Sequence, residues 1–223
     1  MEPVWGGKVD TAAVLRGTSA IGLVQAASPL ESVEVLNDLA KLLCDPEVPA
    51  RTNAAIAVSN FGHEAGAPLL RLKILSGDPE SGVLGKCFTA LLTLSESDSI
   101  PFVAQFLKKD EDPLQLEAAA ALAECKSDQA CAELIDSFKQ CQTVRGKRDL
   151  LTFLGVSGHP LAEEFLLTVV RGDDESEAQA ALHAIAPRRF YERSLAKIRA
   201  AVEERKDRAL AEIFTEKFCT DTP

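Results

Sequence analysis

The first candidate for a functional residue in this sequence is His63, which is followed directly by Glu64 in the stretch NFGHEAGAPLL. A neighbouring histidine and glutamate can bind a metal ion, but a metal site needs three or more ligands brought together, and no further ligand is evident. His63 and His159 both precede a proline, Pro68 or Pro160, that begins an apolar segment. We therefore expect both histidines to lie in turns that begin a helix, with Glu64 as a favourable acid near the helix N-terminus.

Recognised catalytic motifs are absent from the sequence. It contains no GxSxG, Walker A or GxGxxG pattern, and no serine or cysteine is matched with a histidine and an acid that could activate it. His183 lies in the alanine-rich stretch AALHAIA, which predicts a core or groove histidine rather than a catalytic base. The sequence therefore predicts no catalytic residue, no cofactor and no bound metal.

The cysteines lack the spacing of a metal site, because the sequence contains no CxxC pair. We interpret them as buried free thiols of a protein in a reducing compartment, and a disulfide between Cys125 and Cys131 is the alternative. The six cysteines are Cys44, Cys87, Cys125, Cys131, Cys141 and Cys219.

The charge of the chain bears on its partners. It has 34 acidic and 24 basic residues and a net charge of −10, which disfavours nucleic acid because a phosphate backbone would be repelled. With no signal sequence and no run of about 18 apolar residues, we expect a soluble cytoplasmic protein with no membrane partner. Two basic clusters are interpreted as solvated helix ends or as contacts for an acidic partner. Their basic residues are Arg145, Lys147 and Arg148, and Arg188, Arg189 and Arg193.

An Asp-Pro pair recurs along the chain at Asp45, Asp78 and Asp112, at steps of 33 and 34 residues. Pro68 and Pro101 repeat at the same step of 33 and begin second apolar segments. Asp-Pro is typical of a helix start, with the aspartate as N-cap and the proline in the first turn, so each repeat predicts a pair of helices. Pairs of this size bury a common core only when they stack on their neighbours.

The repeats predict an all-α fold, a right-handed α-solenoid (alpha-alpha superhelix) of about six helix pairs that form a single domain over residues 1–223. Alanine-rich runs favour helix and let neighbouring helix axes approach closely. The alternating charges of AKIRAAVEERKDRALAEIF are typical of a polar cap at the end of a stack. The predicted pairs span residues 10–43, 44–76, 77–109, 110–141, 142–171 and 172–205, followed by a capping helix at 207–218.

This pattern resembles the HEAT-repeat superfamily, especially the short bacterial HEAT-like repeats of the phycobilisome-lyase type, over nearly the whole chain. In that family an aspartate followed six residues later by an arginine forms a ladder of pairs along the stack. Asp10 with Arg16 and Asp45 with Arg51 have this spacing, so the resemblance implies a ladder at these units. Later units depart from it, because the residues six positions after Asp78, Asp112 and Asp173 are Leu84, Ala118 and Gln179.

The resemblance implies several functions, because related proteins bind partners, handle chromophores or catalyse reactions. HEAT-like lyases imply a groove that holds a tetrapyrrole or a similar ligand. HEAT-like diiron hydroxylases carry several His-Glu dyads, whereas this chain has one. HEAT-like DNA glycosylases carry a basic face with aromatic side chains, whereas this chain is acidic and its Trp5 and Tyr191 lie at opposite ends. The hydroxylase and glycosylase activities are therefore the less favoured alternatives.

We expect a non-enzymatic protein-interaction scaffold whose partner is a protein of unknown identity. In stacked pairs the second helices commonly line the concave face, where polar side chains between the buried positions can contact a partner. The first helix contains Ile21, Leu23 and Val24 and carries little charge. Either Trp5 folds over this end, or the chain is one part of a longer repeat protein, in which case the end is an interaction surface and self-association through it is expected. The predicted partner-binding residues are Arg71, Lys108, Glu133, Asp136 and Glu164.

Overall fold

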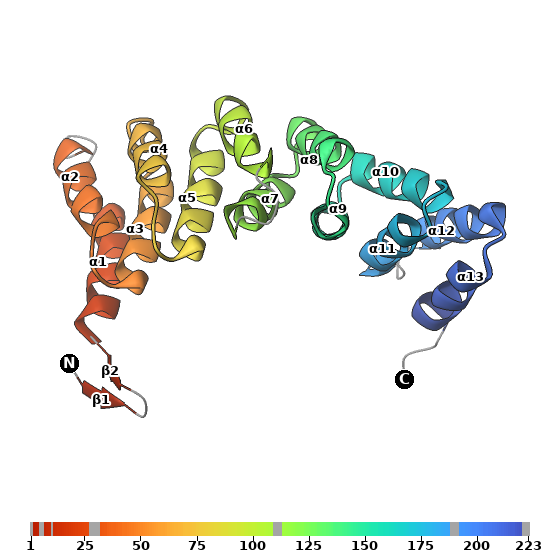
Figure 1. The fold of residues 1–223 in the computed structure, drawn as a ribbon. Helices are drawn as coiled ribbons and strands as arrows, with labels where there is room; N and C mark the ends of the chain where they lie inside the picture. The colour runs from red at the N-terminus through yellow and green to blue at the C-terminus, as the bar shows by residue number, and fades with distance from the viewer. Residues whose placement is uncertain are drawn as a thin grey trace. The chain divides into compact units, whose positions relative to one another are not determined.

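The computed structural model describes residues 2–4, 7–9, 11–26, 32–108, 113–187 and 192–219. The chain divides into two compact units, Met1–Val103 and Ala104–Pro223, and each consists of helices in stacked pairs (Figure 1). None of the helices in the described part of the chain has the length and apolar character that a membrane span needs. The single domain over residues 1–223 stays a prediction.

The first unit begins with an antiparallel hairpin, β1 (Glu2–Val4) and β2 (Gly7–Val9), that was not predicted from the sequence. The helices that follow are α1 (Thr11–Ala26), α2 (Ser32–Leu43), α3 (Val48–Phe61), α4 (Gly66–Ser76), α5 (Ser81–Leu94) and α6 (Glu96–Ala104). The last residue of α6 already belongs to the second unit. Within the first unit, α3 contacts α1 and α5, so first helices of successive pairs lie side by side, and α4 contacts α2 and α5.

The second unit repeats this arrangement. Its elements are the 3₁₀ helix η2 (Gln105–Lys108), α7 (Pro113–Cys125), α8 (Asp128–Gln140), α9 (Val144–Ser157), α10 (Pro160–Arg171), α11 (Glu175–Ile185), α12 (Glu192–Arg205), α13 (Arg208–Phe214) and the π-helix η4 (Thr215–Cys219). The first helix α9 contacts α7 and α11, and the second helix α10 contacts α8 and α12. At the end of the stack α13 packs against α11 and α12 and buries Leu210 and Phe214.

The core of each unit lies between its layer of first helices and its layer of second helices. Leu39 on α2, Leu70 on α4 and Phe88 on α5 are fully buried in the first unit, as are Leu134 on α8 and Leu151 on α9 in the second. Because each helix buries one face against its partner and another against the next pair, the pairs are stable only as a stack. The described residues thus contain six helix pairs, and the predicted HEAT-like α-solenoid fold is confirmed.

The Asp-Pro pairs at Asp45 and Asp78 form turns before the helices, so the prediction of these aspartates as N-caps was wrong. The N-caps are Glu47 for α3 and Glu80 for α5. The Asp45 carboxylate accepts a hydrogen bond from the Glu47 N–H at 2.9 Å, and the Asp78 carboxylate accepts one from the Glu80 N–H at 3.0 Å. Aspartate favours this Asx turn because its side chain reaches the N–H two residues on. Asp112 lies outside the described residues.

The same two carboxylates join successive helix pairs. Arg16 on α1 donates from Nε and Nη2 to the two carboxylate oxygens of Asp45, at 2.7 and 3.0 Å. Arg51 on α3 donates in the same way to Asp78, at 2.8 Å for both bonds. Each arginine therefore binds the aspartate of the following helix pair. Arg51 does not bind the carboxylate of Asp45, six residues before it, and donates instead to the Asp45 backbone carbonyl at 2.9 Å. Asp10, the other predicted member of the ladder, lies outside the described residues.

Asp78 is held by two cations in a nearly dry site. Its side chain is 1% exposed, and Lys73 Nζ lies 2.7 Å from the same carboxylate that binds Arg51. Burial alone raises the pKa of Asp78, but the bonds from Arg51 and Lys73 outweigh it and lower the pKa from 3.8 to about 2. The ladder ends at the next pair, where Leu84 is buried in place of an arginine.

Five of the cysteines are free thiols, namely Cys44, Cys87, Cys125, Cys131 and Cys141, so the alternative of a Cys125–Cys131 disulfide was wrong. Cys87, Cys131 and Cys141 are buried as predicted, whereas Cys125 is half-buried and Cys44 is exposed because it lies in the turn after α2. Burial raises the pKa of the Cys87 thiol to about 12, which keeps it protonated and unreactive.

Candidate partner-binding groove

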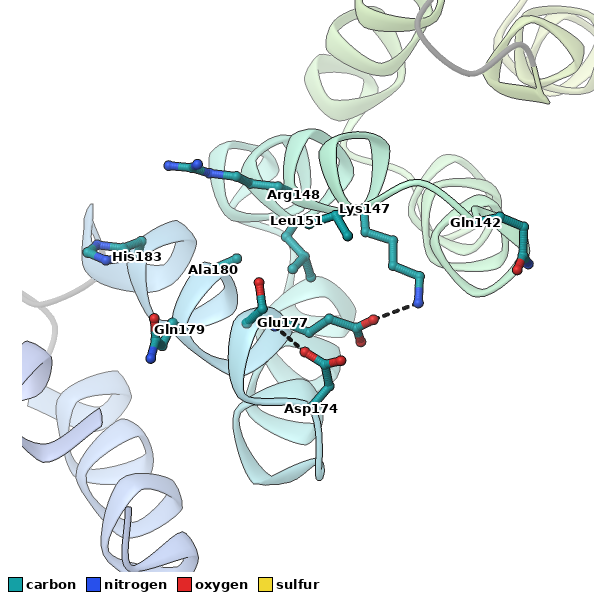
Figure 2. A pocket seen from close by; sticks show the side chains of 11 residues that line it. Gln142, Lys147, Arg148, Leu151, Asp174, Glu177, Gln179, Ala180 and His183 are labelled. Carbon is teal, nitrogen blue, oxygen red and sulfur yellow. Dashed lines mark hydrogen bonds and ion pairs between the residues drawn. The ribbon is translucent and has the colours of Figure 1, made fainter. Parts of the chain in front are cut away.

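A groove of about 380 Å³ lies between the first helices α9 and α11 of the second unit (Figure 2). The two helices touch near their C-terminal ends, where the backbone of Gly155 packs directly against the Ala184 carbonyl. The groove runs along α9 from its start to Leu151 and along α11 from its N-cap, Asp174, to His183, and Leu151 and Ala180 contribute apolar surface to it. It is lined by Gln142, Val144, Lys147, Arg148, Leu151, Asp174, Ser176, Glu177, Gln179, Ala180 and His183.

Two side-chain caps begin the helices that form the groove. The Thr143 hydroxyl accepts a hydrogen bond from the Gly146 N–H at 3.1 Å at the start of α9. The Asp174 carboxylate accepts one from the Glu177 N–H at 2.8 Å at the start of α11. These caps fix the first turns of both helices, and so they fix the positions of the charged side chains that follow.

An ion pair crosses the groove between the two helices. Lys147 Nζ on α9 lies 2.6 Å from Glu177 Oε1 on α11 and 5.5 Å from the centre of the Phe138 ring. The hydrogen bond to Glu177 raises the pKa of Lys147, and the charges of Glu177 and Asp174 act in the same direction. Lys147 is therefore held protonated, which suits it to binding and makes it a poor nucleophile.

Hydrogen-bond donors without an acidic partner lie elsewhere in the groove. Arg148 on α9 and His183 on α11 are both exposed, and Figure 2 shows the Arg148 side chain extending away from Lys147. Within the described residues, neither the Arg148 guanidinium nor the His183 ring forms an ion pair or a side-chain hydrogen bond. The groove therefore combines an internally neutralised pair with two side chains that can receive an anion, and Gln142 and Gln179 add amide donors and acceptors.

None of the predicted partner-binding residues lines this groove. Arg71 connects α4 to α6, since its Nη2 donates to the Asp98 carbonyl at 2.9 Å and its guanidinium lies 5.2 Å from the Phe102 ring centre. Lys108 is exposed at the end of η2. The acidic members of the set lie on two second helices that contact each other, Glu133 and Asp136 on α8 and Glu164 on α10. Asp136 is paired with Lys139 on its own helix, at 3.1 Å.

The predicted turn role of two histidines is confirmed. His63 Nδ1 accepts a hydrogen bond from the Ala65 N–H at 3.1 Å, and His159 Nδ1 accepts one from the Leu161 N–H at 3.3 Å. Both rings therefore carry their proton on Nε2, and that atom of His159 lies 3.1 Å from an oxygen of Asp128. His159 is the N-cap of α10, and His63 stabilises the turn just before α4.

Glu64 is exposed and lies just before Ala65, the N-cap of α4. Among the residues that the structure describes, no group of three or more histidine, cysteine, aspartate or glutamate side chains could hold a metal ion. The third histidine, His183, lies in the groove, which was one of the two places predicted for it, and it is not in the core.

Sequence reasoning found only part of the groove. Arg145, Lys147 and Arg148 stood out as a basic cluster, but their partners did not. Lys147 and Glu177 are 30 residues apart, close to the repeat step, and that spacing is the signal that could have matched them. Arg188 and Arg189 of the second cluster, together with Trp5 and Tyr191, lie outside the described residues, and Arg193 belongs to α12.

Stacked helix pairs joined by Arg-Asp bonds give this chain the fold of a HEAT-like α-solenoid. No protein-family model and no curated protein matches the sequence. Among solved structures, human deoxyhypusine hydroxylase in complex with glycerol is 17% identical, with a TM-score of 0.42, over 95% of this chain and 82% of that chain. The complex of CpcE and CpcF of phycocyanin lyase from Nostoc sp. PCC7120 is also 17% identical, with a TM-score of 0.38, over 86% of this chain and 74% of that chain.

Proposed function

We propose that the protein is a non-enzymatic interaction scaffold and that the groove between α9 and α11 contacts its protein partner. The observation that carries this proposal is the unequal use of charge in the groove. Lys147 and Glu177 neutralise each other at 2.6 Å, whereas Arg148 and His183 are exposed in the same groove without an acidic partner. Such side chains on a scaffold of packed helices are available to a partner at little cost in reorganisation.

A photo-crosslinking amino acid placed at Gln179 tests this function in lysate from the source cells. We expect it to capture a specific protein. Filling the groove with Ala180→Trp should abolish this product, because the indole occupies the space that the partner needs. Ala132→Trp is the matched control, since Ala132 is exposed on α8 away from the groove, and it should leave the product unchanged. Equal products from all three proteins would refute the groove as the contact surface.

The five residues predicted from the sequence remain a second proposed contact surface. Glu133 and Asp136 on α8 and Glu164 on α10 support it for the second unit, because they lie on adjoining second helices. The crosslinking experiment tests it through Glu133→Lys combined with Glu164→Lys. Loss of the partner in this variant would place the contact on the second helices.

The alternative function is the handling of a chromophore or another small ligand. The groove volume of about 380 Å³ favours it, because small-molecule sites commonly enclose about 300–1,000 Å³. An absorption spectrum of protein purified from its source cells separates the two functions. A stoichiometric pigment that Ala180→Trp removes would favour ligand handling over the scaffold.

We also propose that the first unit self-associates through an apolar groove of about 540 Å³ on α1 and α2, with a second copy of the chain as occupant. Leu15 in this groove is 68% exposed. The charges beside it are already paired, because Arg16 binds Asp45 and Asp38 lies 2.7 Å from Lys41. Two such faces can therefore meet without the repulsion that the net charge of −10 would otherwise cause.

Light scattering at micromolar protein concentration should accordingly detect a dimer that Leu15→Glu converts to a monomer. In the dimer this substitution would bury one carboxylate from each copy at the interface without a partner, which is unfavourable. Leu72→Glu is the matched control, because Leu72 on α4 is 65% exposed and lies outside this groove. A monomeric wild-type protein, or equal dissociation by both substitutions, would contradict the expectation.

A further inference from the structure

We propose that the groove between α9 and α11 recognises an extended peptide segment with an acidic side chain at one end and a neutral or basic side chain at the other. This inference rests on the proposed function and adds the chemistry of the partner. It follows from how the charged side chains along the groove are already used.

The acidic side chain of the peptide would lie at Arg148 and His183. Both side chains are exposed, come from opposite walls of the groove and have no acidic partner among the described residues. The nearby carboxylate of Asp149 lies 3.9 Å from Arg145 on the same helix. A guanidinium is well suited to a carboxylate, because its planar donors match the two carboxylate oxygens.

The other end of the peptide would lie near Asp174. This carboxylate is exposed and caps α11 through the Glu177 N–H, and Glu177 itself is bound to Lys147. A second acidic group placed here would be repelled by Asp174, because Lys147 is already neutralised by Glu177 and leaves the charge of Asp174 unbalanced. The groove therefore disfavours a uniformly acidic ligand and gives the bound segment a direction.

The length and lining of the groove suit a peptide. Asp174 and His183 are nine positions apart on α11, or about 13 Å along a helix, which an extended chain covers in about four residues. Gln142 and Gln179 can exchange hydrogen bonds with peptide amides, and Val144 and Leu151 offer apolar contact. A nucleic-acid strand has a negative charge at every step, so Asp174 and the net charge of −10 oppose it.

A displayed library of random ten-residue peptides, selected on the full-length protein, tests this inference. We expect the selected peptides to be enriched in Asp or Glu at one position and depleted in both about four residues away. Changing that acid to its amide in a synthetic peptide should weaken binding about fivefold, the effect of one exposed ion pair, as measured by fluorescence anisotropy.

Protein variants make the test specific to the groove. Arg148→Ala should weaken binding of the selected peptide about fivefold and Arg148→Glu by more than about tenfold, because the latter repels the peptide acid. Arg199→Glu is the matched control, since Arg199 is exposed on α12 away from the groove, and it should leave the affinity unchanged. All of these side chains are exposed, so the fold should be retained, which circular dichroism would verify.

Several outcomes would overturn the inference: a selection that yields no peptide, selected peptides without acidic enrichment, equal effects of Arg148→Glu and Arg199→Glu, or tighter binding of a single-stranded oligonucleotide than of the peptide at equal salt. The Gln179 crosslinking experiment distinguishes this failure from failure of the proposed function. A protein captured there and lost in Ala180→Trp would preserve the scaffold role even if its recognition did not depend on an acidic side chain.

Discussion

Asp78→Asn should lower the free energy of unfolding by about 3 kcal/mol, because removing one partner of a buried ion pair leaves the other charge without compensation. Arg51 and Lys73 both bind this carboxylate, and their side chains are only 9% and 12% exposed. The neutral amide can accept hydrogen bonds but cannot balance two cations. Urea unfolding at neutral pH, followed by circular dichroism, measures the change.

Asp136→Asn is the control for this substitution. Asp136 pairs with Lys139 on the surface of α8, where the two side chains are 60% and 59% exposed, so its loss should change the free energy of unfolding by less than about 1 kcal/mol. Equal effects of the two substitutions would show that burial does not strengthen the Asp78 site as argued.

Acid unfolding gives a second readout of the same site. Folding lowers the pKa of Asp78 from 3.8 to about 2, so the stabilisation from this carboxylate is fully present above the higher value. It is lost as the pH falls from about 4 toward 2, while the carboxylate becomes protonated in the unfolded chain and then in the folded chain. Asp78→Asn should lack this part of the acid dependence, and an unchanged dependence would assign it to other carboxylates.

Gly155→Ala should destabilise the second unit by about 2 kcal/mol, because the added methyl group would overlap the Ala184 carbonyl and the two helices would have to move apart. The obstacle is backbone, so no side-chain rotation can relieve it. Urea unfolding measures the loss of stability, and faster hydrogen exchange in α9 and α11 would locate it. The groove between these helices should change shape as well.

Gly22→Ala is the control, because a methyl group at Gly22 on α1 would meet no atom within 4 Å. Replacing a helical glycine by alanine without a steric clash should stabilise the protein by about 0.5–1 kcal/mol. The same substitution is thus expected to lower the free energy of unfolding at Gly155 and to raise it at Gly22. A stabilising effect of Gly155→Ala would mean that α9 and α11 are less closely packed than the structure shows.

Periodicity in the sequence was sufficient to predict the helix pairs. The steps of 33 and 34 residues between Asp-Pro pairs reflect a repeated unit, and the alanines mark where its helices approach. The roles of His63 and His159 were equally accessible, because a histidine in a short turn finds its partner N–H only two residues away. Such local features depend on neighbouring residues and can be inferred from short stretches of sequence.

It was harder to predict from the sequence whether an Asp-Pro pair forms a helix N-cap or the turn before it. Asp45 and Asp78 were predicted as N-caps, but their carboxylates accept from the N–H two residues on and bind the arginine of the preceding pair. The spacing of six residues between Asp45 and Arg51 suggested that these two side chains bind each other within one helix pair. The Arg51 side chain instead reaches the next helix pair, where the Asp78 carboxylate is more deeply buried than that of Asp45.

The sequence by itself determined the helical repeat, the turn histidines and the basic character of the start of α9, because each is encoded within a few neighbouring residues or in their period. Only the tertiary structure decided which charges meet. Lys147 and Glu177 are 30 residues apart, and the packing of Gly155 against Ala184 aligns α9 with α11 so that they pair. The availability of Arg148 and His183 follows from that alignment, since the groove exists only after the two helices have packed together.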